Sequence, residues 1–265
     1  MPIIWYQIGS LSHVQTRVRR EREIARNAVA TPQLNGNADN SGIAADDVSD
    51  CKMKPSSSPP EAEAEVVSAL GDHARLPMLL GVITCSESLC MVTQFHGVGD
   101  ESLTLHQAAK GSFLTPENSV EIFQELGSAL KHVHSMGYLH NDINANNVVL
   151  EKTPTTSEKS YSPILIDVGK STKAAASSMT SQTSGRKRIA PEHSLKSYLA
   201  PEVIKERLYS AVSDVYSLGK MLKAVSKMVG FYSRVRSLVK EATAERPSLR
   251  PSLDNFLVRL GAIKF

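Results

Sequence analysis

The sequence contains few of the features that mark membrane, secreted or zinc-binding proteins. It has 265 residues and only three cysteines, Cys51, Cys85 and Cys90. These three form neither a disulfide framework nor a zinc-binding pattern, which favours a reducing, cytoplasmic location. No apolar run reaches about 18 residues, so we expect no membrane-spanning helix. Residues 1–10 lack the basic leader and cleavage pattern of a signal peptide, so secretion is not expected.

Charge and composition exclude little more. The formal net charge of +3 points to no particular partner, and the mixed-charge run at residues 17–23 is typical of a solvated helix face or a loose arm. We therefore expect no nucleic-acid binding. Hydrophobic residues make up 41% of the chain, enough for the core of one or two domains. The oligomeric state is left open.

Residues 1–60 are the part least typical of a folded domain. Asn, Asp, Ala, Ser and Pro are frequent in residues 31–60. Such a stretch buries too little apolar surface to offset its conformational entropy. We expect a low-complexity or disordered N-terminal segment over residues 1–60, and the alternative is a degenerate start of the folded domain.

From residue 61 onwards the pattern predicts regular structure. Residues 61–70 begin with acidic residues and end before Gly71, which predicts a short helix. The apolar runs at 76–83 and 89–95 predict two strands.

Further along, the predicted elements are longer. A helix should begin after Thr115 and end near Gly137, because apolar residues recur there every three or four positions. The runs at 148–150 and 163–166 predict a hairpin. Residues 209–224 predict another helix.

Two polar stretches beside these short strands carry the candidate chemistry. His140–Asn147 contains Asp142 and Asn147, and Asp167-Val168-Gly169 follows the second strand of the hairpin. An Asp in this setting can accept a proton from an attacking hydroxyl, while the Asn amide oxygen and a second carboxylate hold magnesium on phosphates. This arrangement is typical of phosphoryl transfer.

Two later stretches, Ala200-Pro201-Glu202 and Asp214–Gly219, complete an ordered set of four motifs. In this order the sequence resembles the eukaryotic protein kinases, whose markers are H-R-D-x-x-x-x-N, D-F-G, A-P-E and D-V-W-S-x-G. The resemblance covers residues 61–265. It implies an α+β, two-lobed fold, with the rest of a small β-rich lobe at 61–96 and a mainly helical lobe at 97–265.

The resemblance also implies a function and roles for particular residues. The function is ATP- and magnesium-dependent transfer of the γ-phosphoryl group to a hydroxyl of a protein substrate, with Asp142 as base and Asn147 and Asp167 on the metal. In the small lobe, Glu63 matches the glutamate that pairs with a strand lysine. Thr93 matches the gatekeeper, and Gln94, Phe95 and His96 match the hinge that binds adenine.

In the large lobe the resemblance implies structural roles. His140 matches a histidine of the catalytic loop whose role is structural. Asp214 should hold the backbone of that loop, and Arg250 should pair with Glu202. The span from Asp214 to Arg250 is short for the family, so the helices that dock substrates should be reduced.

The sequence departs from the kinase pattern in the small lobe. No G-x-G-x-x-G loop precedes residue 61. The candidate for the strand lysine is Lys54, preferred to Lys52, although Pro55 follows it directly. The small lobe is therefore expected to be truncated or eroded.

Two more departures lie in the catalytic loop. Asn141 stands where most regulated kinases have Arg, so control by phosphorylation of the segment between Asp167 and Glu202 is not expected. Asn144 stands where kinases acting on Ser and Thr usually have a Lys that neutralises the transferring phosphoryl group. The choice between Ser/Thr and Tyr hydroxyls stays open.

These departures keep two other functions open. One is a pseudokinase that acts as a binding or scaffold module. The other is a small-molecule kinase of the choline or aminoglycoside type, which is disfavoured because those families generally lack an A-P-E segment.

Overall fold

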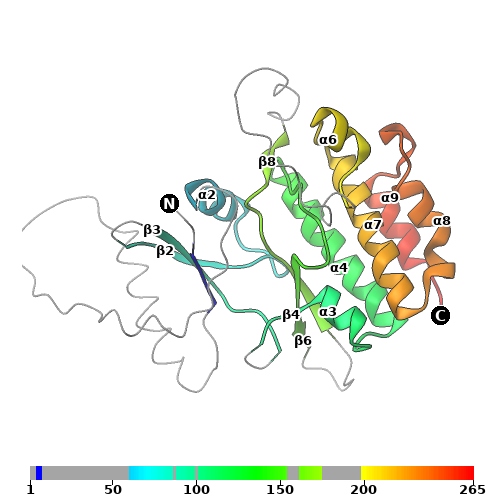
Figure 1. The fold of residues 1–265 in the computed structure, drawn as a ribbon, viewed down its shortest axis with the longest axis horizontal. Helices are drawn as coiled ribbons and strands as arrows, with labels where there is room; N and C mark the ends of the chain where they lie inside the picture. Colours follow the sequence, from blue (N-terminus) through cyan, green and yellow to red (C-terminus); the bar gives the residue numbers. More distant parts are fainter. Residues whose placement is uncertain (1–3, 8–59, 86–87, 99–100, 154–160, 175–197) are drawn as a thin grey trace, which may run out of the picture.

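A computed structural model describes residues 4–7, 60–85, 88–98, 101–153, 161–174 and 198–265. Figure 1 shows two unequal parts, a small sheet with one helix and a larger part built mainly of helices. Lys54 and most of the predicted disordered segment lie outside the described residues. So does most of the stretch between Asp167 and Glu202.

The small part consists of one helix packed on a sheet. Helix α2 (Pro60–Leu70) contacts β2 (Leu79–Cys85) and β3 (Ser88–Thr93). The sheet has the order β1-β3-β2, with β2 antiparallel and β1 (Ile4–Gln7) parallel to β3. Helix α2 ends before Gly71, whose φ of +64° suits a residue without a Cβ atom.

These elements confirm the helix and both strands predicted for this region, with one shift. Strand β2 begins at Leu79 rather than at residue 76, and it continues to Cys85. The shift follows from strand pairing, because Leu79 lies opposite Thr93, the last residue of β3. Beyond that pair, the Met78 carbonyl accepts a hydrogen bond from the Gln94 N–H at 3.0 Å.

Helix α4 (Pro116–Ser135) lies at the centre of the larger part, between the sheet side and the other helices (Figure 1). The side chain of Thr115 accepts a hydrogen bond from the Asn118 N–H and caps the helix start, as predicted. Its buried apolar face contacts α7 (Ala211–Val229) and α9 (Leu253–Gly261). This buried core supports the loops at residues 140–147 and 166–171.

The remaining helices surround this core. Helix α8 (Tyr232–Ala242) packs on α7 and α9, and α3 (Leu105–Lys110) also contacts α7. Helix α6 (Pro201–Glu206) precedes α7, and a short 3-10 helix spans Pro247–Leu249. Between α7 and that 3-10 helix lies only α8, within the continuously described range 198–265. A single α-helix thus separates α7 from the stretch that contains Arg250, and the reduction relative to the family stays a prediction.

Helix α7 differs slightly from the helix predicted over 209–224. It begins two residues later because Ser210 and Ser213 form a reciprocal capping box. It ends five residues later, at Gly230 with a φ of +97°.

Short strands connect the helices to the polar loops. Strands β6 (Val148–Lys152) and β7 (Tyr161–Leu165) form the predicted antiparallel hairpin, and β4 (Leu103–Thr104) pairs with β6. Strand β5 (Tyr138–Leu139) pairs with β8 (Thr172–Lys173). The β5–β8 and β6–β7 pairings hold both ends of residues 140–147 and of residues 166–171.

Across the described ranges, none of the helices is both long and apolar enough to cross a membrane.

Candidate active site

The catalytic loop, residues 140–147, leaves β5 and enters β6. Helix α4 delivers the chain to β5, and the N–H of His106 at the start of α3 donates to the Ala145 carbonyl at 3.1 Å. The N–H of Ile166 donates to the Asn147 carbonyl at 2.9 Å. The loop is therefore fixed by neighbours on both sides.

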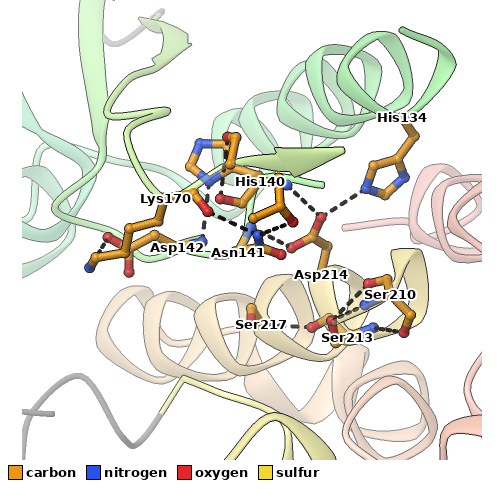
Figure 2. Close-up of polar contacts among 11 residues, drawn as sticks. His134, His140, Asn141, Asp142, Lys170, Ser210, Ser213, Asp214 and Ser217 are labelled. Atoms are coloured by element: carbon orange, nitrogen blue, oxygen red, sulfur yellow. Dashed lines mark hydrogen bonds and ion pairs between the residues drawn. The ribbon is translucent and has the colours of Figure 1, made fainter. Parts of the chain in front are cut away.

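Asp214, in the first turn of α7, holds the start of this loop (Figure 2). Its Oδ2 accepts from the N–H of His140 and its Oδ1 from the N–H of Asn141, each at 2.9 Å. The Asp214 side chain is only 1% exposed. Helix N-termini favour negative charge, so this carboxylate is stabilised where it lies. The geometry agrees with the predicted role of Asp214.

His134 on α4 is a second partner of Asp214. Its Nε2 lies 2.9 Å from Asp214 Oδ2, and Figure 2 shows the ring pointing from α4 toward the carboxylate. Meanwhile His132 Nε2 lies 2.6 Å from the Leu70 carbonyl oxygen. The two histidines face different partners, as their spacing on one helix requires.

His140 is fully buried and helps to position Asp142, two residues further on. Its Nδ1 accepts a hydrogen bond from the Asp142 N–H at 3.3 Å. Burial lowers the pKa of His140, although the charges of Asp214, Asp142 and Asp167 act in the opposite direction. The neutral ring is the form that can accept this bond, so the geometry supports a structural role.

The carboxylate of Asp142 is the central group of the loop. Its Oδ2 accepts from Asn147 Nδ2 at 3.0 Å and from Lys170 Nζ at 2.7 Å. Asn147 Nδ2 also donates to the Asp142 carbonyl at 3.0 Å. The Asn147 amide nitrogen is therefore committed to Asp142, and its amide oxygen is the atom left for a cation.

Asn144 is turned toward the loop itself. Its Nδ2 donates to the Asp142 carbonyl at 3.1 Å, and its Oδ1 accepts from the Asn146 N–H at 3.0 Å. Only 4% of the residue is exposed. This side chain thus stabilises the backbone around Asp142.

Asp167 reaches the same place from the hairpin. It lies two residues after the end of β7, and the hydrogen bond between Ile166, which lies between them, and Asn147 ties this segment to the catalytic loop. Asp167 has a φ of +65°, a conformation in which Asp is one of the few tolerated residues. The half-exposed carboxylate acts on the pKa of His140, which places its charge near the loop.

A buried ion pair holds the A-P-E stretch. Arg250 donates to both carboxylate oxygens of Glu202, at 2.6 and 2.7 Å. Its guanidinium also donates to the carbonyls of Ala244, Glu245 and Val212. The Arg250 side chain has no exposed surface. This is the pairing predicted from the sequence.

The predicted nucleotide-binding residues of the small part are mostly buried. Glu63 on α2 is fully buried, and Thr93 at the end of β3 is 4% exposed. His96 Nδ1 lies 2.7 Å from Glu151 Oε1 on β6. Gln94 and His96 line a pocket of about 370 Å³ together with Glu151. The His96 ring is therefore directed at the β6–β7 hairpin.

With this geometry in place, comparison with known proteins identifies the family. Residues 28–230 match the family model described as protein tyrosine and serine/threonine kinase. The chain belongs to this protein kinase family. The matched region includes all four motifs and begins within the first 60 residues.

Curated relatives agree with this assignment. CBL-interacting protein kinase 22 of Oryza sativa is 28% identical over 61% of this chain and 34% of its own length. Serine/threonine-protein kinase D of Synechocystis is 26% identical over 60% of this chain and 28% of its own length. Serine/threonine-protein kinase PEPKR2 of Arabidopsis thaliana is 28% identical over 62% and 30%. The chain spans about a third of the length of these relatives.

The ligands that a kinase uses for magnesium fit this loop. Magnesium prefers oxygen ligands and is usually held by one or two carboxylates together with substrate phosphates and water. The Asn147 amide oxygen and the Asp167 carboxylate are oxygen donors of this kind. Among the described residues no cluster of three or more His, Cys, Asp or Glu could hold a metal by itself.

Sequence reasoning missed two residues of this kinase site. Lys170 directly follows the Asp167-Val168-Gly169 motif and contacts Asp142. Its position next to that motif could have indicated a place in the site. His134 contacts Asp214 across 80 positions of sequence. No local pattern indicates that second contact.

Proposed function

We propose that this kinase-family chain transfers the γ-phosphoryl group of ATP to a hydroxyl of a protein substrate. One observation carries the proposal. The carboxylate of Asp142 is held at 3.0 Å by the amide of Asn147, and Asp167 lies two residues after β7, in the segment that bonds to the same loop. This supports a site in which a base and one metal ligand come from the catalytic loop and a second ligand comes from the segment after β7, as phosphoryl transfer requires.

In this reaction Asp142 accepts the proton of the attacking hydroxyl. The new bond joins the hydroxyl oxygen to the γ-phosphorus, and the bond from that phosphorus to the bridging oxygen of ADP breaks. Asn144 and His140 act by positioning Asp142 through its backbone. Little covalent chemistry is needed from the protein, so the main contribution is orientation.

Asn147 and Asp167 are the proposed magnesium ligands. Magnesium, when bound, would neutralise charge that develops on the β- and γ-phosphates. The bond from Asn147 Nδ2 to Asp142 orients the amide oxygen away from the base. Base and metal ligand are therefore positioned by the same contact.

For the nucleotide, we propose the hinge at Gln94–His96, with Thr93 as gatekeeper. The His96 ring is committed to Glu151, and the Gln94 N–H already donates to the Met78 carbonyl, so we propose the other backbone groups of the hinge for adenine. Glu63 is the proposed partner of the strand lysine, for which Lys54 stays the candidate. Two of the relatives described above are named serine/threonine-protein kinases, so Ser and Thr hydroxyls are the first acceptors to test.

The second candidate function is a pseudokinase. It is favoured by the contact of Lys170 Nζ with Asp142 Oδ2 at 2.7 Å, because this ammonium occupies one of the two carboxylate oxygens of the proposed base. The absence of a G-x-G-x-x-G loop from the sequence supports it as well.

The deciding experiment is transfer of labelled γ-phosphate from ATP to casein with magnesium. We expect activity in the native chain and its loss in Asp142→Asn and Asp167→Ala. Asp254→Asn is a matched control, since that aspartate lies on α9 and is largely exposed. Transfer that persists in Asp142→Asn would contradict the role of the base.

The same assay separates the alternatives. An inactive chain that still binds a partner protein would favour the pseudokinase. Transfer to choline or an aminoglycoside but not to casein would favour a small-molecule kinase.

A further inference from the structure

Lys170 is a basic side chain in direct contact with the proposed base, Asp142. Its Nζ lies 2.7 Å from Asp142 Oδ2, and within the described part of the chain it is the only Lys or Arg that forms an ion pair with this carboxylate. The lysine side chain is 39% exposed, whereas that of Asp142 is 11% exposed. Figure 2 shows the Lys170 side chain reaching the Asp142 carboxylate, so the ammonium is the more exposed member of this ion pair.

The backbone at Lys170 is held in place. The side-chain amide of Asn141 donates to the Lys170 carbonyl at 2.9 Å and to Thr172 Oγ1 at 3.0 Å. The turn that contains Lys170 is closed by the Ser171 N–H, which donates to the Val168 carbonyl at 2.9 Å. On the far side, β8 pairs with β5. A side chain projecting from so fixed a backbone is preorganised toward Asp142.

The catalytic loop lacks a cation of its own. Asn144 stands where a lysine would neutralise the transferring group, and its amide is bonded to the backbone of Asp142 and Asn146. A neutral, buried amide supplies no charge to the phosphoryl oxygens. The charge that position 144 lacks is present on Lys170, one residue past the Asp167-Val168-Gly169 motif.

We propose that Lys170 is a catalytic cation of this kinase and replaces a lysine at position 144. The proposal rests on the phosphotransfer function given above. When ATP and acceptor are bound, the Lys170 ammonium contacts the γ-phosphoryl oxygens as that group passes to the acceptor oxygen. The hydroxyl proton goes to Asp142, the electron pair of the broken bond goes to ADP, and Lys170 keeps its proton throughout.

Two features of an ammonium suit it to this role. It carries three N–H donors, so it can bond the Asp142 carboxylate and a phosphoryl oxygen together. It also offsets the repulsion between that carboxylate and the anionic phosphate. Asn141, which replaces the usual arginine, then serves to hold Lys170 through its carbonyl.

An inhibitory role of Lys170 predicts the opposite change in the rate of transfer. If Lys170 only blocks Asp142, its removal frees the base and transfer becomes faster. If it is a catalytic cation, its removal slows transfer.

The test compares Lys170→Met, Lys170→Arg, Asn144→Lys and the double variant Lys170→Met/Asn144→Lys in single-turnover transfer from ATP to casein. Removing one preorganised donor of this kind costs about a hundredfold in rate. We expect Lys170→Met to lower the rate of the chemical step by at least about tenfold with little change in KM for ATP. Lys170→Arg should keep most of the rate, and Asn144→Lys should restore the Lys170→Met enzyme.

Controls separate a catalytic role from a structural one. Lys240→Met changes an exposed lysine on α8 and should leave the rate unchanged. Lys170→Met should leave the melting temperature unchanged, because the pair is partly exposed. Even if Asn144→Lys fails to fold, the rates of Lys170→Met and Lys170→Arg decide the question.

The outcomes also distinguish this inference from the proposed function. A native chain active in an Asp142-dependent way, with Lys170→Met equally fast or faster, overturns the role of Lys170 alone. A native chain without any transfer overturns both.

Discussion

The two parts of this molecule support their proposed functional residues in different ways. In the large part, buried side chains bond to the loop backbone, and Asp214 alone accepts from His140, Asn141 and His134. In the small part, the proposed hinge has one side-chain pair, between His96 and Glu151, and the glutamate is 33% exposed. Desolvated charge therefore fixes the catalytic loop of the large part, whereas the described His96–Glu151 pair at the hinge is partly exposed.

The largest effect should come from Arg250→Ala in the large part. The change leaves Glu202 without its partner, and breaking a buried ion pair from one side costs about 3 to 5 kcal/mol. Arg250 also donates to three carbonyls, which would lose their partners together. Urea unfolding followed by circular dichroism measures the change. A loss below about 1 kcal/mol, the value typical of surface pairs, would contradict the assigned burial.

Asp214→Asn should have the next largest effect and should separate stability from catalysis. An amide keeps the shape of the carboxylate but removes its charge and one acceptor oxygen. We expect a loss of about 2 to 3 kcal/mol in unfolding free energy, because an N–H of the loop stays buried without a partner. Transfer activity should fall by more than the loss of folded protein alone would cause. The reason is that Asp214 holds the backbone of His140 and Asn141, the two residues before the proposed base.

The control for Asp214→Asn is Ser217→Ala on the same helix. Ser217 Oγ donates to the carbonyls of Tyr198 and Ser213, not to the loop. That variant should lose some stability and keep the chemical step. Equal activity losses in the two variants would contradict a specific link between Asp214 and the loop.

This contrast also explains how far the sequence could predict the structure. The contacts of Asp214 and Arg250 could be predicted because Asp214, and Glu202 as the partner of Arg250, belong to motifs that follow the family's order. Helix α4 and the β6–β7 hairpin could be predicted because their apolar periodicity is strong. The contact between Lys170 and Asp142 could not, since it depends on where the backbone turns after β7.

In the small part, residue patterns predicted the helix and two strands, but they did not predict which strands pair. The parallel pairing of β1 with β3 joins residues more than 80 positions apart, and strand propensity alone does not choose partners. The ring of His96 turns to Glu151 because the hairpin lies against the hinge, which is a tertiary contact. Asn144 was expected at a catalytic position, and its contacts with the loop backbone are also set by the local fold.

The pH dependence of stability should be governed in part by His140. Burial lowers its pKa in the folded state below the usual value of 6.5, so the native state resists protonation. Above about pH 6.5 both states are neutral and stability is full, and as the pH falls further the unfolded chain binds the proton first. Stability should then fall with a slope of at most about 1.4 kcal/mol per pH unit for one proton.

His140→Asn isolates this contribution, because the Asn oxygen can still accept the bond from Asp142. Unfolding free energies measured between pH 5 and 8 should show a shallower slope in that variant. His73 has a pKa lowered by burial and by the charges of His132 and Arg75, so it contributes with the same sign. If His140→Asn leaves the slope of unfolding free energy against pH unchanged, other groups must cause the pH dependence.

The smallest effect is expected in the small part, from Glu151→Gln. The amide keeps one oxygen that can accept a hydrogen bond from His96 Nδ1, and the pair is partly exposed, so the loss should be at most about 1 kcal/mol. ATP affinity should hardly change, since we propose that adenine contacts the hinge backbone. Binding of ATP measured by calorimetry tests this, with Glu241→Gln on α8 as a control for loss of an exposed carboxylate. A large loss of ATP affinity in Glu151→Gln alone would mean that the hinge, like the catalytic loop, depends on a side-chain pair for its geometry.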